Sequence, residues 1–203
     1  MQRLPIMAFA AGAHVFPGGA VDPLDDASLP VTGSSIEAIA GVMGAAPDRA
    51  RRLVAAAVRE TFEECGVVLT SGAGAASWSA SDRADLLAGR TSVGALVERG
   101  RSSVDLSALV PWAWWLTPDF IPRRYDTWFF LVNLPPEREP VHVDDGEAVA
   151  AGWWNVDAAL DANRRGEMLL LPPTLLVLTG LSEAGSVDEA LATRPHHLEQ
   201  RSG

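Results

Sequence analysis

The spacing of apolar residues changes along the chain, and its clearest period lies between residues 48 and 65. There the apolar side chains recur every three or four positions, which is the repeat of one face of an α-helix. They are Leu53, Val54, Ala57, Val58 and Phe62. Because Gly66 follows where a left-handed C-terminal cap is expected, the pattern predicts one long amphipathic helix over residues 48–65.

Shorter helices are predicted on both sides of this one. Serines stand at positions that suit N-caps, where a hydroxyl accepts a hydrogen bond from the first helical turn. Ser34 and Ser35 precede one apolar stretch, and Ser79 and Ser81 precede another. Ser186 begins S-V-D-E, which has the spacing of a capping box. The predicted ranges are 36–43, 82–88, 92–99, 156–165, 173–181 and a last helix from 186.

Runs of aromatic and β-branched residues predict strands between the helices. These runs cover residues 67–70, 109–116, 127–134 and 149–155. Strands with interspersed helices are typical of an α/β or α+β fold, in which a mixed sheet packs between layers of helices. The 203 residues suit one domain, 1–203, in which residues 20–47 form an insertion and residues 79–100 a helical excursion.

The charge of the chain narrows the classes of ligand. A formal net charge of −10 opposes loose binding to nucleic acid or to an anionic membrane, because a polyanion needs a basic face. A phosphate compound would need some other means of attachment. A divalent cation is the obvious means, since it bridges protein carboxylates and ligand phosphates.

The cysteine content and the hydropathy pattern suggest a compartment. Cys65 is the single cysteine of the sequence, so the chain has no intramolecular disulfide and does not need an oxidising environment. Within the sequence there is no apolar run long enough to cross a membrane. We therefore expect a soluble, cytoplasmic protein.

Three glutamates near the end of the long helix carry the strongest chemical signal. Glu60, Glu63 and Glu64 stand at i, i+3 and i+4, so their side chains leave one face of the helix. Like charges so close repel one another, and a bound Mg²⁺ or Mn²⁺ would turn the repulsion into coordination, because hard cations prefer carboxylate oxygens. The alternative is an acidic face exposed to solvent.

Two segments together resemble the Nudix box. R-E-T-F-E-E-C-G-V, residues 59–67, fits its second half, R-E-U-x-E-E-x-G-U with U apolar, except at Thr61, where an aliphatic residue is usual. V-F-P-G-G-A-V-D, residues 15–22, is similar to its first half. The resemblance implies the Nudix fold and hydrolysis of a nucleoside diphosphate linked to a further group, with a divalent metal and water.

The distance between the two halves departs from the compact motif, G-x5-E-x7-R. Ala20–Val58 place 39 residues between glycine and arginine, far more than that motif has. Counting back from Arg59 puts Arg51 where the first glutamate of the box should stand. The substitutes that the insertion offers are Asp22, Asp25, Asp26 and Glu37.

An insertion at this point is a feature of the Nudix branch that resembles the acyl-coenzyme A diphosphatases. W-W-L-T-P at residues 114–118, P-R-R-Y-D-T at 122–127 and L-P-P-T at 171–174 also look like that branch. A coenzyme A signature is matched at Arg3, Gly12 and residues 16–19, whereas Leu4 and Ala8 replace its serine and second arginine.

The resemblance also implies roles for individual residues. Glu63 and Glu64 would be metal ligands, Glu60 a ligand or the general base, and the carbonyl of Gly18 a further ligand. Arg59 would orient a carboxylate of the helix. Glu147, in D-D-G-E, is either another metal-binding or base glutamate or a loop carboxylate. Arg123 and Arg124 would grip phosphates, or form surface pairs with Asp119 or Asp126.

The expected function is metal-dependent hydrolysis of coenzyme A or acyl-coenzyme A to 3',5'-ADP and (acyl-)phosphopantetheine. The alternatives are hydrolysis of another nucleotide conjugate, such as ADP-ribose or NADH, and a Nudix-fold binding module without catalysis. The expected partner is a small nucleotide substrate, without nucleic acid or membrane. Dimerisation is common in the family, and a partner subunit is one way to complete the sheet edge that residues 1–11 only briefly supply.

Overall fold

The computed structural model describes residues 1–3, 12–26, 28–72, 78–121, 124–134, 148–193 and 196–197. The chain divides into two compact units. The terminal unit consists of Met1–Phe16, Pro111–Val132 and Asp144–Gly203, and the helical unit of Pro17–Val110 and Asn133–Val143. Helices and short strands occur in both, so the fold is of the mixed α/β class, as the sequence predicts.

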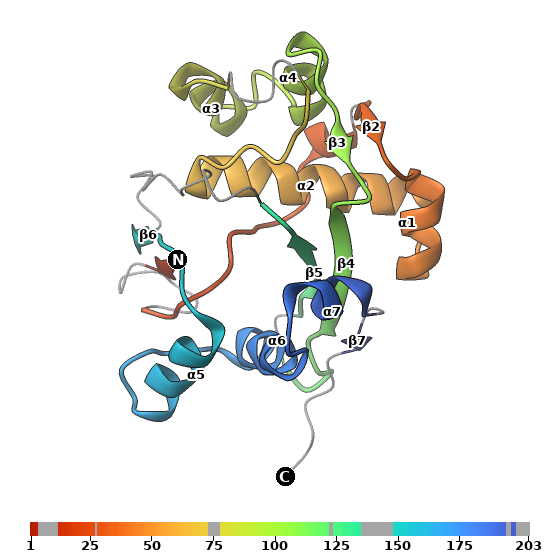
Figure 1. Cartoon of the computed structure of the whole chain (residues 1–203). Helices are drawn as coiled ribbons and strands as arrows, with labels where there is room; N and C mark the ends of the chain where they lie inside the picture. The colour runs from red at the N-terminus through yellow and green to blue at the C-terminus, as the bar shows by residue number, and fades with distance from the viewer. Residues whose placement is uncertain are drawn as a thin grey trace. The chain divides into compact units, whose positions relative to one another are not determined.

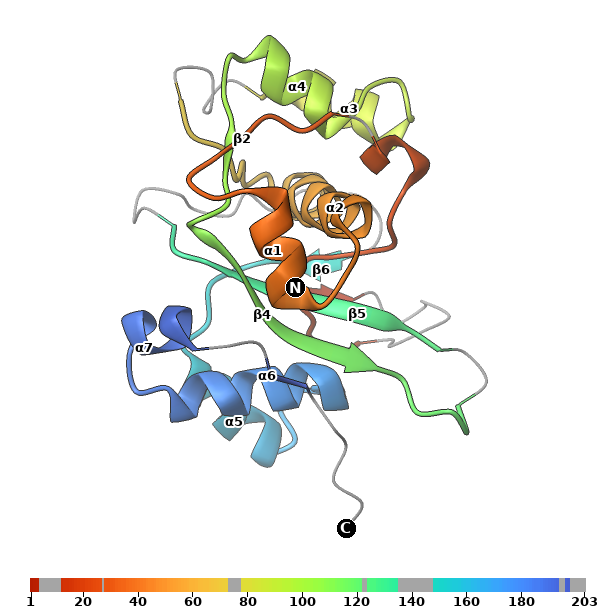
Figure 2. The ribbon, with the colours of Figure 1, turned by 90° about the vertical axis from the view of Figure 1, so that its right-hand side faces the viewer.

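The helical unit is built around α2, Pro47–Cys65, the 19-residue helix drawn in orange to yellow in Figure 1. In Figures 1 and 2 the two short helices of the excursion lie together on one side of α2. The other elements of this unit are η1 (Pro23–Asp26), β2 (Val31–Thr32), α1 (Ile36–Met43), α3 (Ala80–Leu87), α4 (Val93–Arg99) and β3 (Val104–Asp105). Strands β2 and β3 pair in parallel.

Helix α2 begins and ends where the sequence predicts. Pro47 stands in the first turn, where the missing N–H of proline costs no helical hydrogen bond. Gly66 caps the other end in the left-handed conformation, φ 68°, and its N–H donates to the carbonyl of Phe62. The apolar stripe of the helix is buried at Val54 and Val58, so packing as well as capping stabilises it.

Serine hydroxyls start the neighbouring helices, which confirms their predicted ranges to within one or two residues. Ser35 accepts from the N–H of Ala38 at the start of α1, and Ser92 caps α4 in the same way. Ser79 forms a reciprocal capping box with Asp82 in α3. The excursion is therefore an ordered pair of helices.

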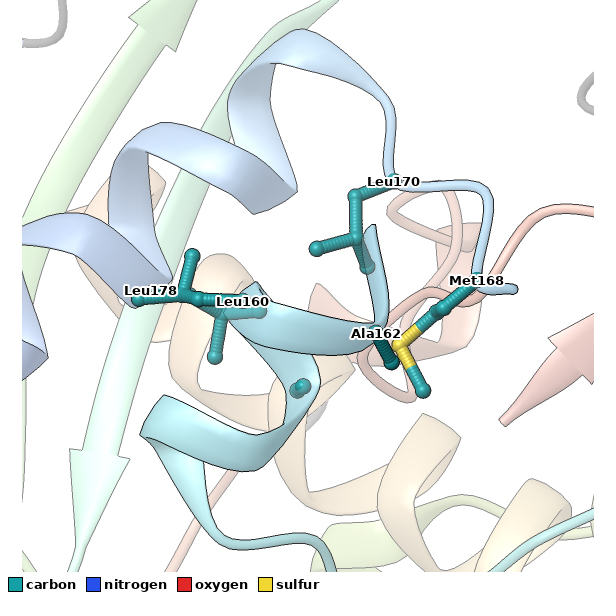
Figure 3. Packing of buried hydrophobic residues seen from close by; sticks show 6 residues of the cluster. Leu160, Ala162, Met168, Leu170 and Leu178 are labelled. Carbon is teal, nitrogen blue, oxygen red and sulfur yellow. The ribbon is translucent and has the colours of Figure 1, made fainter. Parts of the chain in front are cut away.

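The terminal unit contains a three-stranded sheet in the order β5-β4-β7. Its core is formed by buried side chains of α5 and α6 and of the segment between them, and Figure 3 shows Leu160 and Leu178 of this cluster. Trp112 of β4, 1% exposed, packs with Val177 and donates through Nε1 to the carbonyl of Ala190. The elements are β1 (Gln2–Arg3), β4 (Leu109–Leu116), β5 (Asp126–Val132), β6 (Ala148–Ala150), α5 (Val156–Arg164), α6 (Pro172–Glu183), α7 (Val187–Ala192) and β7 (His196–His197).

Two of the predicted strands are wrong in whole or in part. Residues 67–70 form no strand, although three of the four are buried, and only Ser71 beyond them makes an isolated bridge, to Ser103. The predicted strand 149–155 is already over at Ala150, and Trp153 and Trp154 are 61% and 58% exposed. In both places apolar and aromatic residues indicated a strand, but the type of side chain alone provides no neighbour to pair with.

No helix in the described part of the chain is both long enough and apolar enough to cross a membrane.

Candidate functional site

The last two turns of α2 place the predicted site residues within the helical unit. Glu63 and Glu64 are 6% and 7% exposed, and Glu60 is half-buried. An acidic face on a solvated helix would leave its carboxylates in water. The burial therefore rules out that alternative, and each carboxylate must be held by named partners, because an unpaired buried charge is costly.

Glu64 is bound to the glycine turn that precedes the insertion. The N–H of Gly18 donates to Oε2 of Glu64 at 2.7 Å, across 46 positions of sequence. The resemblance to the Nudix box implies the carbonyl of Gly18 as a metal ligand, whereas the contact seen uses its N–H. This hydrogen bond brings the two halves of the divided motif into one site.

Glu60 lies directly against the backbone of Gly19. A Cβ atom added at Gly19 would lie 2.3 Å from Oε1 of Glu60 and 2.6 Å from its Cδ. No real Cβ makes contacts this short, so the carboxylate has room only because residue 19 has no side chain. The second glycine of F-P-G-G thus provides space for Glu60.

Arg59 joins the carboxylates of the site to the start of the insertion. A guanidinium has five N–H donors, and all five have an acceptor. Nε and Nη2 donate to Oδ1 and Oδ2 of Asp25, both at 3.1 Å, and Nη2 also donates to the carbonyl of Ala20 at 2.8 Å. Nη1 donates to Oε1 of Glu60 at 2.8 Å and to Oε2 of Glu63 at 3.0 Å. Arg59 is thereby fixed on all sides.

The charges of this cluster do not balance, because Arg59 meets three carboxylates, those of Asp25, Glu60 and Glu63, and Arg83 adds one further positive charge near Glu63. Burial raises the pKa of Glu60 and of Glu63, and the adjacent guanidinium offsets only part of that rise. Burial would lower the pKa of Arg59, but the hydrogen bonds to Asp25 and the charges of the glutamates outweigh it and raise this pKa. The site therefore has an excess of negative charge.

The donors of the cluster suit a divalent cation, but their arrangement does not yet converge on one. Carboxylate oxygens are the ligands that Mg²⁺ and Mn²⁺ prefer. Among the residues described, however, no group of three or more His, Cys, Asp or Glu side chains is placed to hold a metal ion. Nη1 of Arg59 bonds to one oxygen of Glu60 and to one of Glu63, so part of this donor set faces the guanidinium.

A cavity of about 120 Å³ opens beside the cluster. Asp25, Arg59 and Glu63 line it together with Leu24 and Leu87, whose side chains are partly exposed. Its polar wall carries more acid than base. The cavity thus has room for water or a small cation and offers little attraction to a free anion.

Of the other predicted site residues, the structure describes Arg124. Arg124, in the terminal unit, pairs with Asp119 at 2.6 Å and donates to the carbonyl of Thr117. This is one of the surface pairs that the sequence allows. Arg123 and Glu147 lie outside the described residues.

Arg83 also supports the cluster, without a signal in the sequence. Arg83 of α3 donates through Nε to the backbone carbonyl of Glu63 at 2.5 Å. The helix that carries Arg83 was predicted, but a bond to a carbonyl has no side-chain partner that a sequence pattern could reveal. The helical excursion therefore contacts the helix of the motif at the position of Glu63.

Known proteins that resemble the chain agree with the motif. The NUDT19 Nudix domain model matches residues 43–181. The chain is 29% identical to the human acyl-coenzyme A diphosphatase NUDT19 and 27% identical to its chicken counterpart, in each case over 93% of this chain. It spans 61% and 62% of the length of these two relatives.

A solved structure shows the same fold. The crystal structure of a NUDIX hydrolase from Alicyclobacillus acidocaldarius matches with a TM-score of 0.75 and 28% sequence identity, over 96% of this chain and 86% of that one. The match confirms the fold class that the sequence predicts. With the family model covering more than half of the residues, the chain belongs to the Nudix hydrolase family, in the group that the NUDT19 Nudix domain describes.

Proposed function

We propose that the chain hydrolyses the diphosphate linkage of a nucleoside diphosphate joined to a second group, and that this compound is coenzyme A or an acyl-coenzyme A. The hydrogen bond between Gly18 and Glu64 is the main support, because it assembles one site from the two halves of the Nudix motif. Coenzyme A is suggested by the insertion in the box and by the printed names of the human and chicken relatives. The products would be 3',5'-ADP and (acyl-)phosphopantetheine.

Glu60, Glu63 and Glu64 are the residues that we expect to hold Mg²⁺ or Mn²⁺. They are hard donors on one helix face, and the excess negative charge around Arg59 favours a cation there. When bound, the metal would neutralise diphosphate charge and lower the pKa of a bound water. Nη1 of Arg59 contacts only one oxygen of Glu60 and one of Glu63, so the second oxygen of each carboxylate would be the one to bind the cation.

Glu60 is also a candidate for the general base. Its pKa is raised by burial, which brings it closer to the working pH, and a base with such a pKa holds a proton more readily. Arg59 and the backbone of Gly19 fix the direction in which its carboxylate points. Glu147 is the second candidate for this role, and Arg123 and Arg124 remain proposed phosphate-binding residues.

The two compact units would work as one Nudix domain. The family model supports this, because its match, residues 43–181, includes parts of both units. The insertion and the excursion would then be additions to that domain within the helical unit.

The test is a substrate panel with a matched pair of variants. Coenzyme A, acetyl-coenzyme A, ADP-ribose, NADH and nucleoside triphosphates are incubated with protein and Mg²⁺ or Mn²⁺, and the products are separated by chromatography. Wild type should release 3',5'-ADP from coenzyme A or its thioester. Glu64→Gln should be inactive, and Glu98→Gln, at an exposed site on α4, should match wild type.

Each outcome of the panel has a separate meaning. Turnover that prefers ADP-ribose or NADH would contradict the coenzyme A assignment but keep diphosphate hydrolysis. Full activity of Glu64→Gln would contradict the metal site. Silence of the wild type on every compound would favour a Nudix-fold binding module.

A further inference from the structure

We propose that Asp25, which the insertion supplies, takes the place of the missing first glutamate of the box and acts as the positioning residue of Arg59. The proposal rests on the proposed function, since it concerns the same cluster. Among the acids that the insertion offers, the sequence leaves the choice open between Asp22, Asp25, Asp26 and Glu37. Side-chain contacts and burial favour Asp25.

Asp25 binds Arg59 through both of its carboxylate oxygens. Oδ1 accepts from Nε and Oδ2 from Nη2, each at 3.1 Å, in the two-point geometry that fixes the plane of a guanidinium. Asp25 is 3% exposed, and the Arg59 side chain is 11% exposed. A pair so sheltered from water is screened little by salt and holds its partner in one orientation.

A hydrogen-bonded turn delivers Asp25 to this position. The side chain of Asp22 accepts from the N–H of Leu24 at 2.8 Å, and the N–H of Asp22 donates to Oδ2 of Asp25 at 2.7 Å. The chain then enters η1, where the N–H of Asp25 donates to the carbonyl of Asp22. This local turn, and not the length of the insertion, sets the place of the carboxylate.

The other acids have different surroundings. Asp22 is exposed, and its carboxylate is engaged with Leu24 in the same turn. Glu37 is exposed on α1. The side chain of Asp26 lies outside the described set. Arg51, at the position of the usual first glutamate, pairs with Asp48 on the surface of α2.

The consequence reaches the metal-binding carboxylates through Arg59. Asp25 takes Nε and one N–H of Nη2, which leaves Nη1 directed at Glu60 and Glu63. If the charge of Asp25 is removed, the guanidinium loses its only two-point partner among the described residues. It would then shift towards the glutamates and compete more strongly for the oxygens that a cation needs.

The experiment is a double-mutant cycle between Asp25 and Arg59. Wild type, Asp25→Asn, Arg59→Gln and the double variant are compared by kcat/KM on the best substrate of the panel and by the Kd for Mn²⁺ of the metal-free protein. Supporting groups of this kind are worth about 10–100-fold in metal affinity or activity, so we expect a loss of that size for Asp25→Asn. In the Arg59→Gln background the same change should cost less than about twofold, because its target is gone.

Two further variants separate positioning from general stability. Asp25→Glu keeps the charge and both acceptor oxygens, so it should recover a large part of the activity and of the Mn²⁺ affinity. Asp48→Asn removes an exposed acid from the first turn of α2 and should match wild type in both. Thermal unfolding of every variant shows whether it is folded. If Asp25→Asn does not fold, the comparison of Asp25→Glu with wild type and with Arg59→Gln decides whether Asp25 acts through Arg59.

The results that overturn the proposal differ from those that overturn the function. Equal losses from Asp25→Asn with and without Arg59 would show that Asp25 does not act through Arg59. The same conclusion would follow if Asp25→Glu folds but loses as much activity and Mn²⁺ affinity as Asp25→Asn or Arg59→Gln. If wild type binds Mn²⁺ but hydrolyses nothing, the proposed function fails, and the Mn²⁺ cycle still tests Asp25. If wild type neither binds Mn²⁺ nor hydrolyses any compound, the proposed function and the proposed role of Asp25 both fail.

Discussion

The backbone N–H of Gly18 and the carboxylate of Glu64 are joined by a 2.7 Å hydrogen bond, although 46 positions separate them in sequence. The bond connects the turn before the insertion to the end of α2. A 39-residue separation of the two motif halves therefore does not separate their side chains in space. Long insertions of this kind cost little, because the entropy of closing a loop grows only slowly with its length.

Mn²⁺ should stabilise the wild-type protein and not the Glu64→Gln variant. A ligand that binds only the folded state raises its stability, by about 2.7 kcal/mol at a hundred times Kd, which corresponds to roughly 5–10 °C for a chain of this size. The measurement is thermal unfolding after EDTA treatment, with and without Mn²⁺. The melting temperature of Glu98→Gln should rise with Mn²⁺ as much as that of wild type. An equal rise for Glu64→Gln would mean that the ion binds at another site.

Gly19→Ala should damage activity far more than it damages folding. The new methyl group would lie 2.3 Å from Oε1 of Glu60, so the carboxylate must leave its position, while the exposed turn itself can adjust. We expect a loss of about 100-fold in kcat/KM, comparable to misplacing a group that must be aligned within an ångström.

The matched control for this glycine variant is Gly41→Ala. A Cβ at Gly41, on the exposed side of α1, meets nothing within 4 Å, and alanine favours a helix by about 1 kcal/mol over glycine. Gly41→Ala should therefore be slightly more stable and fully active. Equal activity of both variants would show that Glu60 is not needed at its observed position.

Arg83→Gln should lower activity by about tenfold without unfolding the protein. Arg83 donates to the carbonyl of Glu63, so its loss loosens the turn of α2 that presents this glutamate. The control is Arg90→Gln, because Arg90 forms its ion pair with Asp85 on the exposed surface near α3. Steady-state kinetics with a thermal scan of each variant checks the prediction, which a wild-type rate in Arg83→Gln would contradict.

Asp82→Ala should destabilise the excursion in a manner that depends on pH. Burial would raise the pKa of Asp82, but the hydrogen bonds from Ser79 and Arg99 outweigh it and lower this pKa. A carboxyl whose pKa is lowered by folding stabilises the protein above its unfolded pKa, near 3.9, and this contribution is lost as pH falls through the folded pKa. We expect about 1–2 kcal/mol of destabilisation at pH 7, the usual size for a lost cap.

Urea unfolding at pH 7 and at about pH 3 measures the difference between Asp82→Ala and wild type, and linkage predicts that the difference shrinks at the lower pH. Glu98→Gln, at an exposed position on α4, is the control. A difference that stays constant with pH would mean that Asp82 contributes through packing and not through its charge.

The parts of the site that the sequence predicts are those with a local signature. The helical period of α2, its cap at Gly66 and the spacing of the three glutamates depend on neighbours within about one turn, and each was found in place. The glycine turn was also assigned to the site from its motif. That the motif's acids are buried, and not solvated, follows only from packing.

The parts that the sequence does not predict depend on contacts between distant segments. Four acids of the insertion are equivalent as a pattern, and Asp25 is distinguished by its contacts with Arg59 and by the turn that starts at Asp22. Arg83 was missed because its acceptor is a backbone carbonyl, which every residue has. The strand predicted at residues 67–70 failed for a related reason, since burial and β-branching do not supply a pairing partner.

The crowded surroundings of Arg59 also set a rule for redesigning the box. Cutting out residues 20–47 to make a compact motif would remove Ala20 and Asp25 together, and with them three of the five acceptors of the guanidinium. A shortened protein would have to keep the turn up to η1, or install a glutamate in place of Arg51. The first seven residues of the insertion belong to the site, and farther along it β2 pairs with β3 and α1 buries Ile36 and Ile39, so trimming would also cost the packing of the helical unit.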